Sequence, residues 1–95
     1  MPEVLDAAAV DAALADRAIE WTRVDSELTK VVRRKGFAGA LAFVNAVGAL
    51  AEAADHHPDI DIRWNVVTLR LSTHSAGGIT EKDLSLAAEI DAEVD

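Results

Sequence analysis

The fold is decided by a stretch of sixteen residues without a charge, Gly36-Phe-Ala-Gly-Ala-Leu-Ala-Phe-Val-Asn-Ala-Val-Gly-Ala-Leu-Ala51. Its larger apolar residues recur at steps of three and four, which predicts a helix from Phe37 to about Ala54. The other side of this helix is also apolar, so the helix needs cover on two sides. One side can lie on a sheet, and we expect another subunit to cover the second; the alternative is that a helix near the N-terminus covers it alone.

The segments around this helix alternate between apolar and polar residues in the manner of strands, as in Val67, Leu69 and Leu71 against their polar neighbours. A capping box, Thr80-Glu-Lys-Asp83, opens a last helix. The predicted strands cover residues 19–24, 27–34, 60–64 and 66–73, and an Ala-rich helix at residues 6–18 precedes them. This order predicts an α+β fold, one domain over residues 1–95, with helices packed on one face of a four-stranded, mainly antiparallel sheet.

Composition narrows the function classes. The 95 residues include no cysteine, which excludes a disulfide framework, a thiolate nucleophile and a cysteine zinc site. A net charge of -8 argues against direct nucleic-acid binding, and we interpret the basic strip at residues 17–35 as scattered solvated charge. The N-terminus is acidic where a secretory leader needs Lys or Arg, and the uncharged run is shorter than the ~20 residues that cross a bilayer. We therefore expect a soluble, cytoplasmic protein with no membrane partner.

The three histidines are the leading candidates for chemistry. His56 and His57 follow the long helix, and His74 ends the strand at residues 66–73. If the intervening strands form a hairpin, three imidazoles line one pocket, and imidazole titrates near pH 6.5, which suits proton transfer. The structural alternative is that each histidine caps an element or lies on the surface. A zinc site is a further alternative, disfavoured because adjacent residues rarely aim at one ion and no H-E-x-x-H motif is present.

Two acidic residues are candidates for supporting roles. Glu52 lies one turn before His56 on the same helix face and could orient it, although a solvated residue is the simpler interpretation. Asp83 is most simply the third helical residue of the capping box, and a role toward substrate is the minority interpretation.

Four segments together resemble the pterin-4a-carbinolamine dehydratases. They are Ala51-Glu-Ala-Ala-Asp-His-His-Pro58, then Asn65, then Val67-Thr-Leu-Arg-Leu-Ser-Thr-His74, then Gly78-Ile-Thr-Glu-Lys-Asp83. The family shares an A-E-x-x-x-H-H-P segment, a strand that ends L-S-T-H and a G-[LI]-[ST]-x-x-D helix start at this spacing. The resemblance covers about residues 19–92, and the combination of H-H-P with S-T-H is highly specific.

The resemblance implies a hydro-lyase that needs no cofactor and no metal. Its substrate class is a 4a-hydroxytetrahydropterin, which loses water to give a quinonoid dihydropterin, so that the tetrahydrobiopterin used by aromatic amino-acid hydroxylases is recycled. Carried over by motif, His56 and His74 form the acid–base pair and His57 holds the pterin. The same carry-over gives Pro58, Thr73 and Ser75 as residues that border the ring, and Glu52 and Asp83 as supporting carboxylates. It also implies a homodimer or homotetramer.

This sequence departs from the family pattern at three positions beside the expected pocket. Two positions after the H-H-P proline, where the family usually has an aromatic residue, this chain has Ile60. Trp64 stands at the family's tyrosine-like position, and Ser75 stands where an acid often follows S-T-H. These changes bear on substrate preference more than on the type of reaction. The alternative function is non-catalytic, because some relatives are also dimerisation cofactors of a homeodomain transcription factor.

Overall fold

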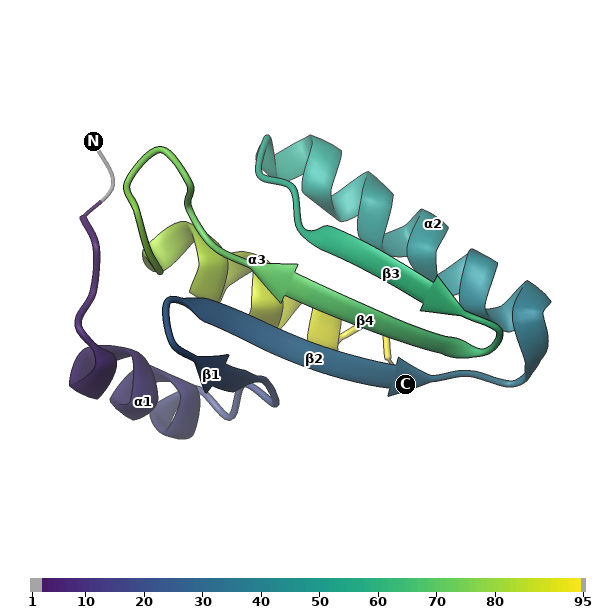
Figure 1. Ribbon diagram of the computed structural model, residues 1–95, viewed down its shortest axis with the longest axis horizontal. Coiled ribbons are helices and arrows are strands. Elements are labelled where there is room, and N and C mark those ends of the chain that lie inside the picture. Colours follow the sequence, from purple (N-terminus) through teal and green to yellow (C-terminus); the bar gives the residue numbers. More distant parts are fainter. Residues whose placement is uncertain (1–2, 95) are drawn as a thin grey trace.

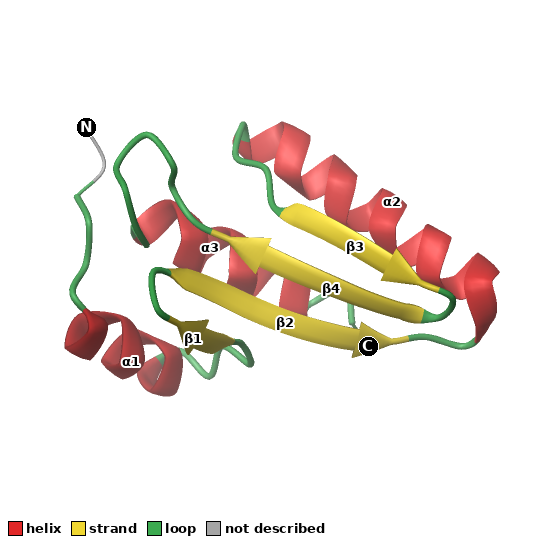
Figure 2. Ribbon diagram, viewed as in Figure 1, coloured by secondary structure: helices red, strands yellow, loops and turns green. Residues whose placement is uncertain are grey.

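The computed structural model describes residues 3–94. Three helices and four strands alternate as the sequence predicts (Figure 1, Figure 2). The elements are α1 (Ala7–Asp16), β1 (Thr22–Val24), β2 (Glu27–Arg33), α2 (Gly36–Ala54), β3 (Asp59–Arg63), β4 (Val66–Leu71) and α3 (Glu81–Asp91). The strands form one sheet in the order β1-β2-β4-β3 with every neighbouring pair antiparallel, so the predicted α+β fold is confirmed.

The core lies on one face of the sheet. On β4 the side chains of Val67, Leu69 and Leu71 are fully buried, while Thr68 and Arg70 between them point to the other face. The register pairs Leu71 with Leu28 and Val67 with Val32 of β2, so the buried residues of both strands share a face. The helices α2 and α3 cover this face with the buried residues Ala40, Phe43, Val47, Ala51, Leu84, Leu86, Ala87 and Ile90.

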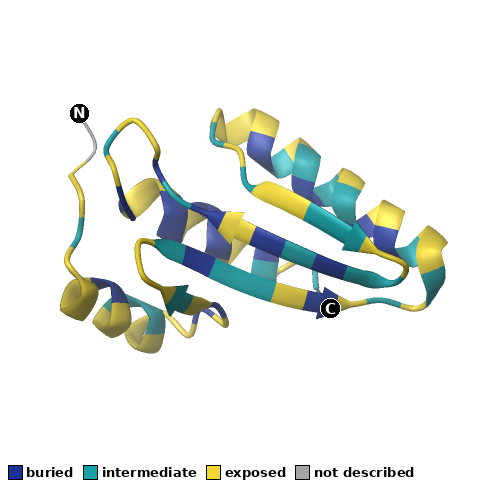
Figure 3. Ribbon diagram, viewed as in Figure 1, coloured by how far each residue is buried: buried dark blue, intermediate teal, exposed yellow. Residues whose placement is uncertain are grey.

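The helix α1 does not cover α2. It lies beside β1, at the edge of the sheet opposite to β3 and α2, where Val10 is buried (Figure 1). The outer side of α2 consequently stays open, and Phe37 and Leu41 are 46% and 41% exposed (Figure 3). The alternative that the N-terminal helix alone covers the second apolar side is therefore wrong.

The first strand is shorter than predicted. Residues 19–21 alternate in burial as a strand would, but they do not pair with β2. Hydrogen bonds from side chains replace the missing strand-to-strand bonds there. Lys30 Nζ donates to the carbonyl of Glu20, and the Glu20 N–H donates to Asp91 Oδ2. The alternation marks a buried, extended connection, and β1 begins at Thr22.

By length and composition alone, the 19 residues of α2 could cross a membrane, because the helix continues three residues beyond the uncharged run that ends at Ala51. In this fold one side of α2 packs on the core through Phe43 and Val47. The apolar character of α2 is thus used in part by the interior of the domain.

Candidate active site

The chain between α2 and β3 is shaped by the end of the helix. Asp55 adopts the left-handed conformation (φ 51°, ψ 44°), and its N–H still reaches the carbonyls of Ala51 and Glu52. This cap turns the chain away from the helix axis, so His56 and His57 no longer follow the helical spacing. Pro58 then favours an extended backbone at His57 and leads into β3.

The three histidines line one cleft. Its volume is about 280 Å³. The lining residues are Asp55, His56, His57, Ser72, Thr73, His74, Ser75 and Lys82. Three segments that are distant in sequence meet there: the end of α2, the segment after β4 and the first turn of α3 (Figure 1). The antiparallel pair β3 and β4 returns the chain to the start of β3, which is why the hairpin places His74 near His56 and His57.

A buried carboxylate holds His56 in place. Asp83 is fully buried, and its Oδ1 lies 2.5 Å from His56 Nε2. Its Oδ2 accepts from the Thr73 hydroxyl at 2.8 Å and from the Thr80 N–H at 2.9 Å. The second of these contacts belongs to the capping box of α3, so Asp83 both starts the helix and fixes the histidine.

The direction of each hydrogen bond in this network follows from the count of protons. Thr73 has one hydroxyl proton and gives it to Asp83, so the Thr80 hydroxyl must donate to Thr73 Oγ1, 2.7 Å away. Thr80 Oγ1 in turn accepts from the Lys82 N–H at 3.2 Å. The Asp83 carboxylate can only accept, so His56 Nε2 carries a proton and Nδ1 is the nitrogen that can receive one.

The other two histidines lie in more exposed surroundings. His57 Nε2 pairs with Glu52 Oε2, and their side chains are 55% and 78% exposed. His74 is exposed, and within residues 3–94 no hydrogen bond or ion pair involves its side chain. One imidazole of the cleft is thus held rigidly on a buried acid, while His57 and His74 have greater access to solvent.

Glu52 is a solvent-exposed residue, as the simpler interpretation had it, but its partner is not the His56 that the alternative named. Glu52 pairs with His57 rather than His56, because the left-handed Asp55 ends the helix before the i, i+4 spacing can apply. Asp83 is the carboxylate that lies beside His56.

The structure also revises which residues border the cleft. Pro58 does not line it, whereas Thr73 and Ser75 do. Sequence reasoning missed Ser72 and Lys82. The available signal for Lys82 was its position directly before the capping-box Asp83, and for Ser72 its position directly before Thr73. Over residues 3–94, no group of three His, Cys, Asp or Glu side chains is placed to hold a metal ion.

The family model and the similar proteins that match this chain carry the same family name. The family model described as pterin 4 alpha carbinolamine dehydratase matches residues 3–93. A protein of Roseiflexus castenholzii, provisionally named a pterin-4-alpha-carbinolamine dehydratase, is 53% identical over 91 residues, which are 96% of this chain and 97% of that protein.

Two solved structures share the fold. The crystal structure of a transcriptional coactivator/pterin dehydratase from Brucella melitensis superposes with a TM-score of 0.90 at 32% identity, covering 98% of this chain and all of the other. A pterin dehydratase-like protein, identified as a RuBisCO assembly factor in the alpha-carboxysome, gives a TM-score of 0.64 at 26% identity, covering 79% of this chain and 87% of that one.

Proposed function

The chain belongs to the pterin-4a-carbinolamine dehydratase family, and from this premise we propose that it dehydrates a 4a-hydroxytetrahydropterin in the cleft lined by His56, His57 and His74. In this reaction the bond between C4a and its hydroxyl oxygen breaks and N5 loses a proton. The N5–C4a double bond of a quinonoid dihydropterin forms, and the hydroxyl leaves as water after it receives a proton. One acid and one base suffice, and the proposed reaction uses no cofactor and no metal.

His56 acts as the base. The Asp83 carboxylate keeps the proton of the neutral ring on Nε2, which leaves Nδ1 able to take the proton from N5. The imidazolium that forms then lies against a carboxylate whose other contacts are already satisfied by Thr73 and Thr80. The hydrogen-bonded arrangement of His56 on buried Asp83 is the observation that carries the proposal.

His74 acts as the acid. It enters the cleft from the segment after β4, whereas His56 enters from the end of α2, so the two rings approach a bound pterin from different elements. Its exposure lets it recover a proton from solvent after each turnover. His57, paired with Glu52, holds the pterin ring; Thr73 and Ser75 border the ring, and Pro58 acts through the backbone of His57.

The test is a stopped-flow measurement of the loss of 4a-hydroxytetrahydropterin. The wild-type protein accelerates the loss, and a metal chelator leaves the rate unchanged. The double variant His56→Ala with His74→Ala abolishes the acceleration while circular dichroism stays that of a folded α+β domain. Retained activity in a folded double variant overturns the acid–base assignment, and loss of wild-type activity to the chelator would favour the zinc alternative.

A non-catalytic binding role is the alternative function. The two solved relatives carry names that include a coactivator and an assembly factor. If this chain has only such a role, the wild-type protein leaves the rate of 4a-hydroxytetrahydropterin loss at its uncatalysed value. The wild-type arm of the experiment above therefore separates the two functions.

The protein acts as a homo-oligomer joined through α2. The outer side of this helix exposes Phe37 and Leu41 beside small residues, and the Phe37 ring stacks on the exposed Trp64 ring, so these side chains form an apolar surface. Leu41→Glu places a charge in that interface, so analytical ultracentrifugation should give a smaller species for the variant than for the wild-type protein. A wild-type monomer would refute the assembly without affecting the dehydration proposal.

A further inference from the structure

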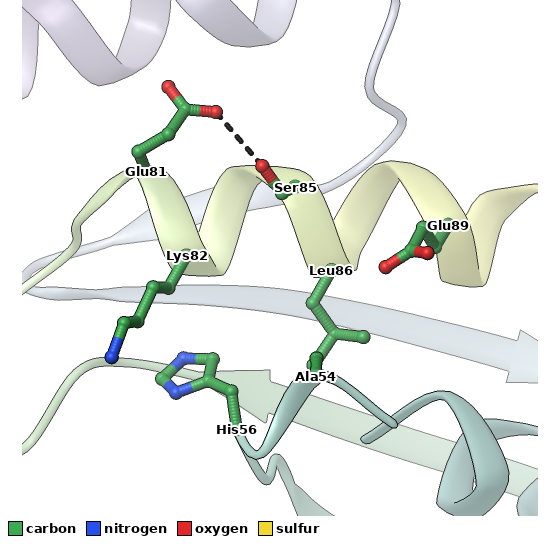
Figure 4. A pocket seen from close by; sticks show the side chains of 7 residues that line it. All are labelled: Ala54, His56, Glu81, Lys82, Ser85, Leu86 and Glu89. Carbon is green, nitrogen blue, oxygen red and sulfur yellow. Dashed lines mark hydrogen bonds between the residues drawn. The ribbon is translucent and has the colours of Figure 1, made fainter. Parts of the chain in front are cut away.

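A second hollow lies directly against the cleft. Its volume is about 240 Å³, and it shares two walls with the cleft, His56 and Lys82 (Figure 4). The remaining lining residues are Ala54, Glu81, Ser85, Leu86 and Glu89. The acid–base proposal gives no role to this hollow or to any of the five residues that it does not share with the cleft.

The hollow is elongated along α3. Lys82 and Glu89 lie at opposite ends of the group in Figure 4, and seven residues of helix separate them by about 10 Å. Ala54 and Leu86 approach each other from the two helices and give an apolar middle. A ligand that enters from the His56 end would therefore pass carbon atoms first and reach Glu89 last.

Two carboxylates line the hollow. Glu81 accepts two hydrogen bonds from the Arg17 guanidinium and one from the Ser85 hydroxyl, and the Arg17 contact holds the pKa of Glu81 below its ordinary value. The Glu81 carboxylate is therefore already bound by Arg17 and Ser85, and it stays ionised at neutral pH. Glu89 is exposed at the far end of the hollow, and within residues 3–94 no hydrogen bond or ion pair involves its side chain.

We propose that this hollow is a subsite for a short, uncharged aliphatic substituent at C6 of the pterin ring, an inference that rests on the proposed function. C6 is bonded to N5, the atom that loses its proton to His56. A substituent at C6 therefore starts beside His56, which is one of the two residues that line both spaces. Ala54 and Leu86 contact its carbon atoms, and Glu89 repels a negative charge at its end.

The sizes of the two spaces agree with this division. The cleft alone, about 280 Å³, is slightly below the ~300–1,000 Å³ typical of small-molecule sites, and the hollow nearly doubles the space. The bicyclic ring and its substituent thus occupy separate spaces with different lining. The ring meets the polar cleft, and the substituent meets the apolar middle of the hollow.

The test compares dissociation constants of stable 7,8-dihydropterins, measured by fluorescence titration: the unsubstituted ring, the 6-propyl derivative and the 6-(2-carboxyethyl) derivative. The wild-type protein should bind the propyl derivative at least about tenfold more tightly than the unsubstituted ring, since full burial of three carbons is worth ~50-fold. The carboxyethyl derivative, matched in length, should lose this advantage, and Glu89→Gln should restore part of it.

Ala54→Leu fills the middle of the hollow. The dissociation constant of the unsubstituted ring divided by that of the 6-propyl derivative should therefore fall toward one. Ala53→Leu, on the neighbouring exposed residue outside the hollow, is the matched control and keeps the wild-type ratio. If Ala54→Leu does not fold, Ser85→Leu fills the same space from α3. A wild-type ratio of one, or a ratio that neither filling variant changes, overturns the subsite; failure to bind even the unsubstituted ring overturns the proposed function itself.

Discussion

Replacing Asp83 by asparagine removes one charge from the interior and little else. The aspartate side chain is fully buried and accepts hydrogen bonds from His56, Thr73 and Thr80. Asparagine has the same shape but offers one acceptor oxygen and one NH2 group. If the oxygen keeps its two donors, from Thr73 and Thr80, the NH2 group faces His56 Nε2.

The consequence for His56 follows from proton counting. Two donors cannot face each other, so Nε2 must give up its proton and the neutral ring must carry it on Nδ1. The nitrogen assigned as the base is then blocked. Since general acid–base catalysis contributes ~10²–10⁴-fold, we expect kcat to fall by about that factor. The loss of a hydrogen bond to a charged group should lower the free energy of unfolding by ~1–3 kcal/mol.

The assay is stopped-flow dehydration together with ¹⁵N NMR of the histidine rings, which reports the tautomer of His56 directly. Asp59→Asn is the matched control, because Asp59 is exposed and does not line the cleft, and it should keep the wild-type kcat. A wild-type kcat in a folded Asp83→Asn protein, or an unchanged His56 tautomer, would refute the reasoning.

Three further predictions concern the supports of the site. Thr73→Val removes one donor to Asp83 and should lower the free energy of unfolding by ~1–3 kcal/mol, measured by urea denaturation. Asp55→Ala should be less stable than Asp55→Gly by roughly 1 kcal/mol in the same assay, because Asp55 has a left-handed backbone that glycine adopts more readily; equal stabilities would contradict the cap. Arg17→Gln should lower Tm by a few degrees at most at pH 7. Since Arg17 depresses the pKa of Glu81, this stabilisation is lost as pH falls through that lowered pKa, and thermal melts of variant and wild type should converge at more acidic pH.

Most of the architecture follows from periodicity alone. The three- and four-residue steps of α2, the alternation of β4 and the capping box of α3 each correspond to an observed element. The alternation at residues 19–21 misled because burial and sheet pairing are separate properties. Ile19 and Trp21 are buried without pairing to a strand, and Lys30 and Asp91 bind the backbone groups of the exposed Glu20 between them. No local pattern reveals such long-range partners.

The candidate site was likewise predictable from the sequence only in part. The hairpin argument was enough to expect three imidazoles around one space, but the partner of each imidazole was not predictable. The left-handed backbone of Asp55 redirects the chain, and as a result Glu52 contacts His57 and Asp83 contacts His56. Lys82 enters the cleft because the capping box fixes the first turn of α3, a consequence of tertiary packing rather than of spacing.

The most direct test of the central claim is a crystal structure of the protein, grown without oxygen, with 5,6,7,8-tetrahydropterin bound, because this ligand carries the N5–H that His56 is proposed to remove. We expect the ring in the cleft, with its N5–H donating a hydrogen bond to His56 Nδ1 and with His74 beside C4a. A pterin bound elsewhere on the protein, or in the cleft with N5 turned away from His56, would contradict it.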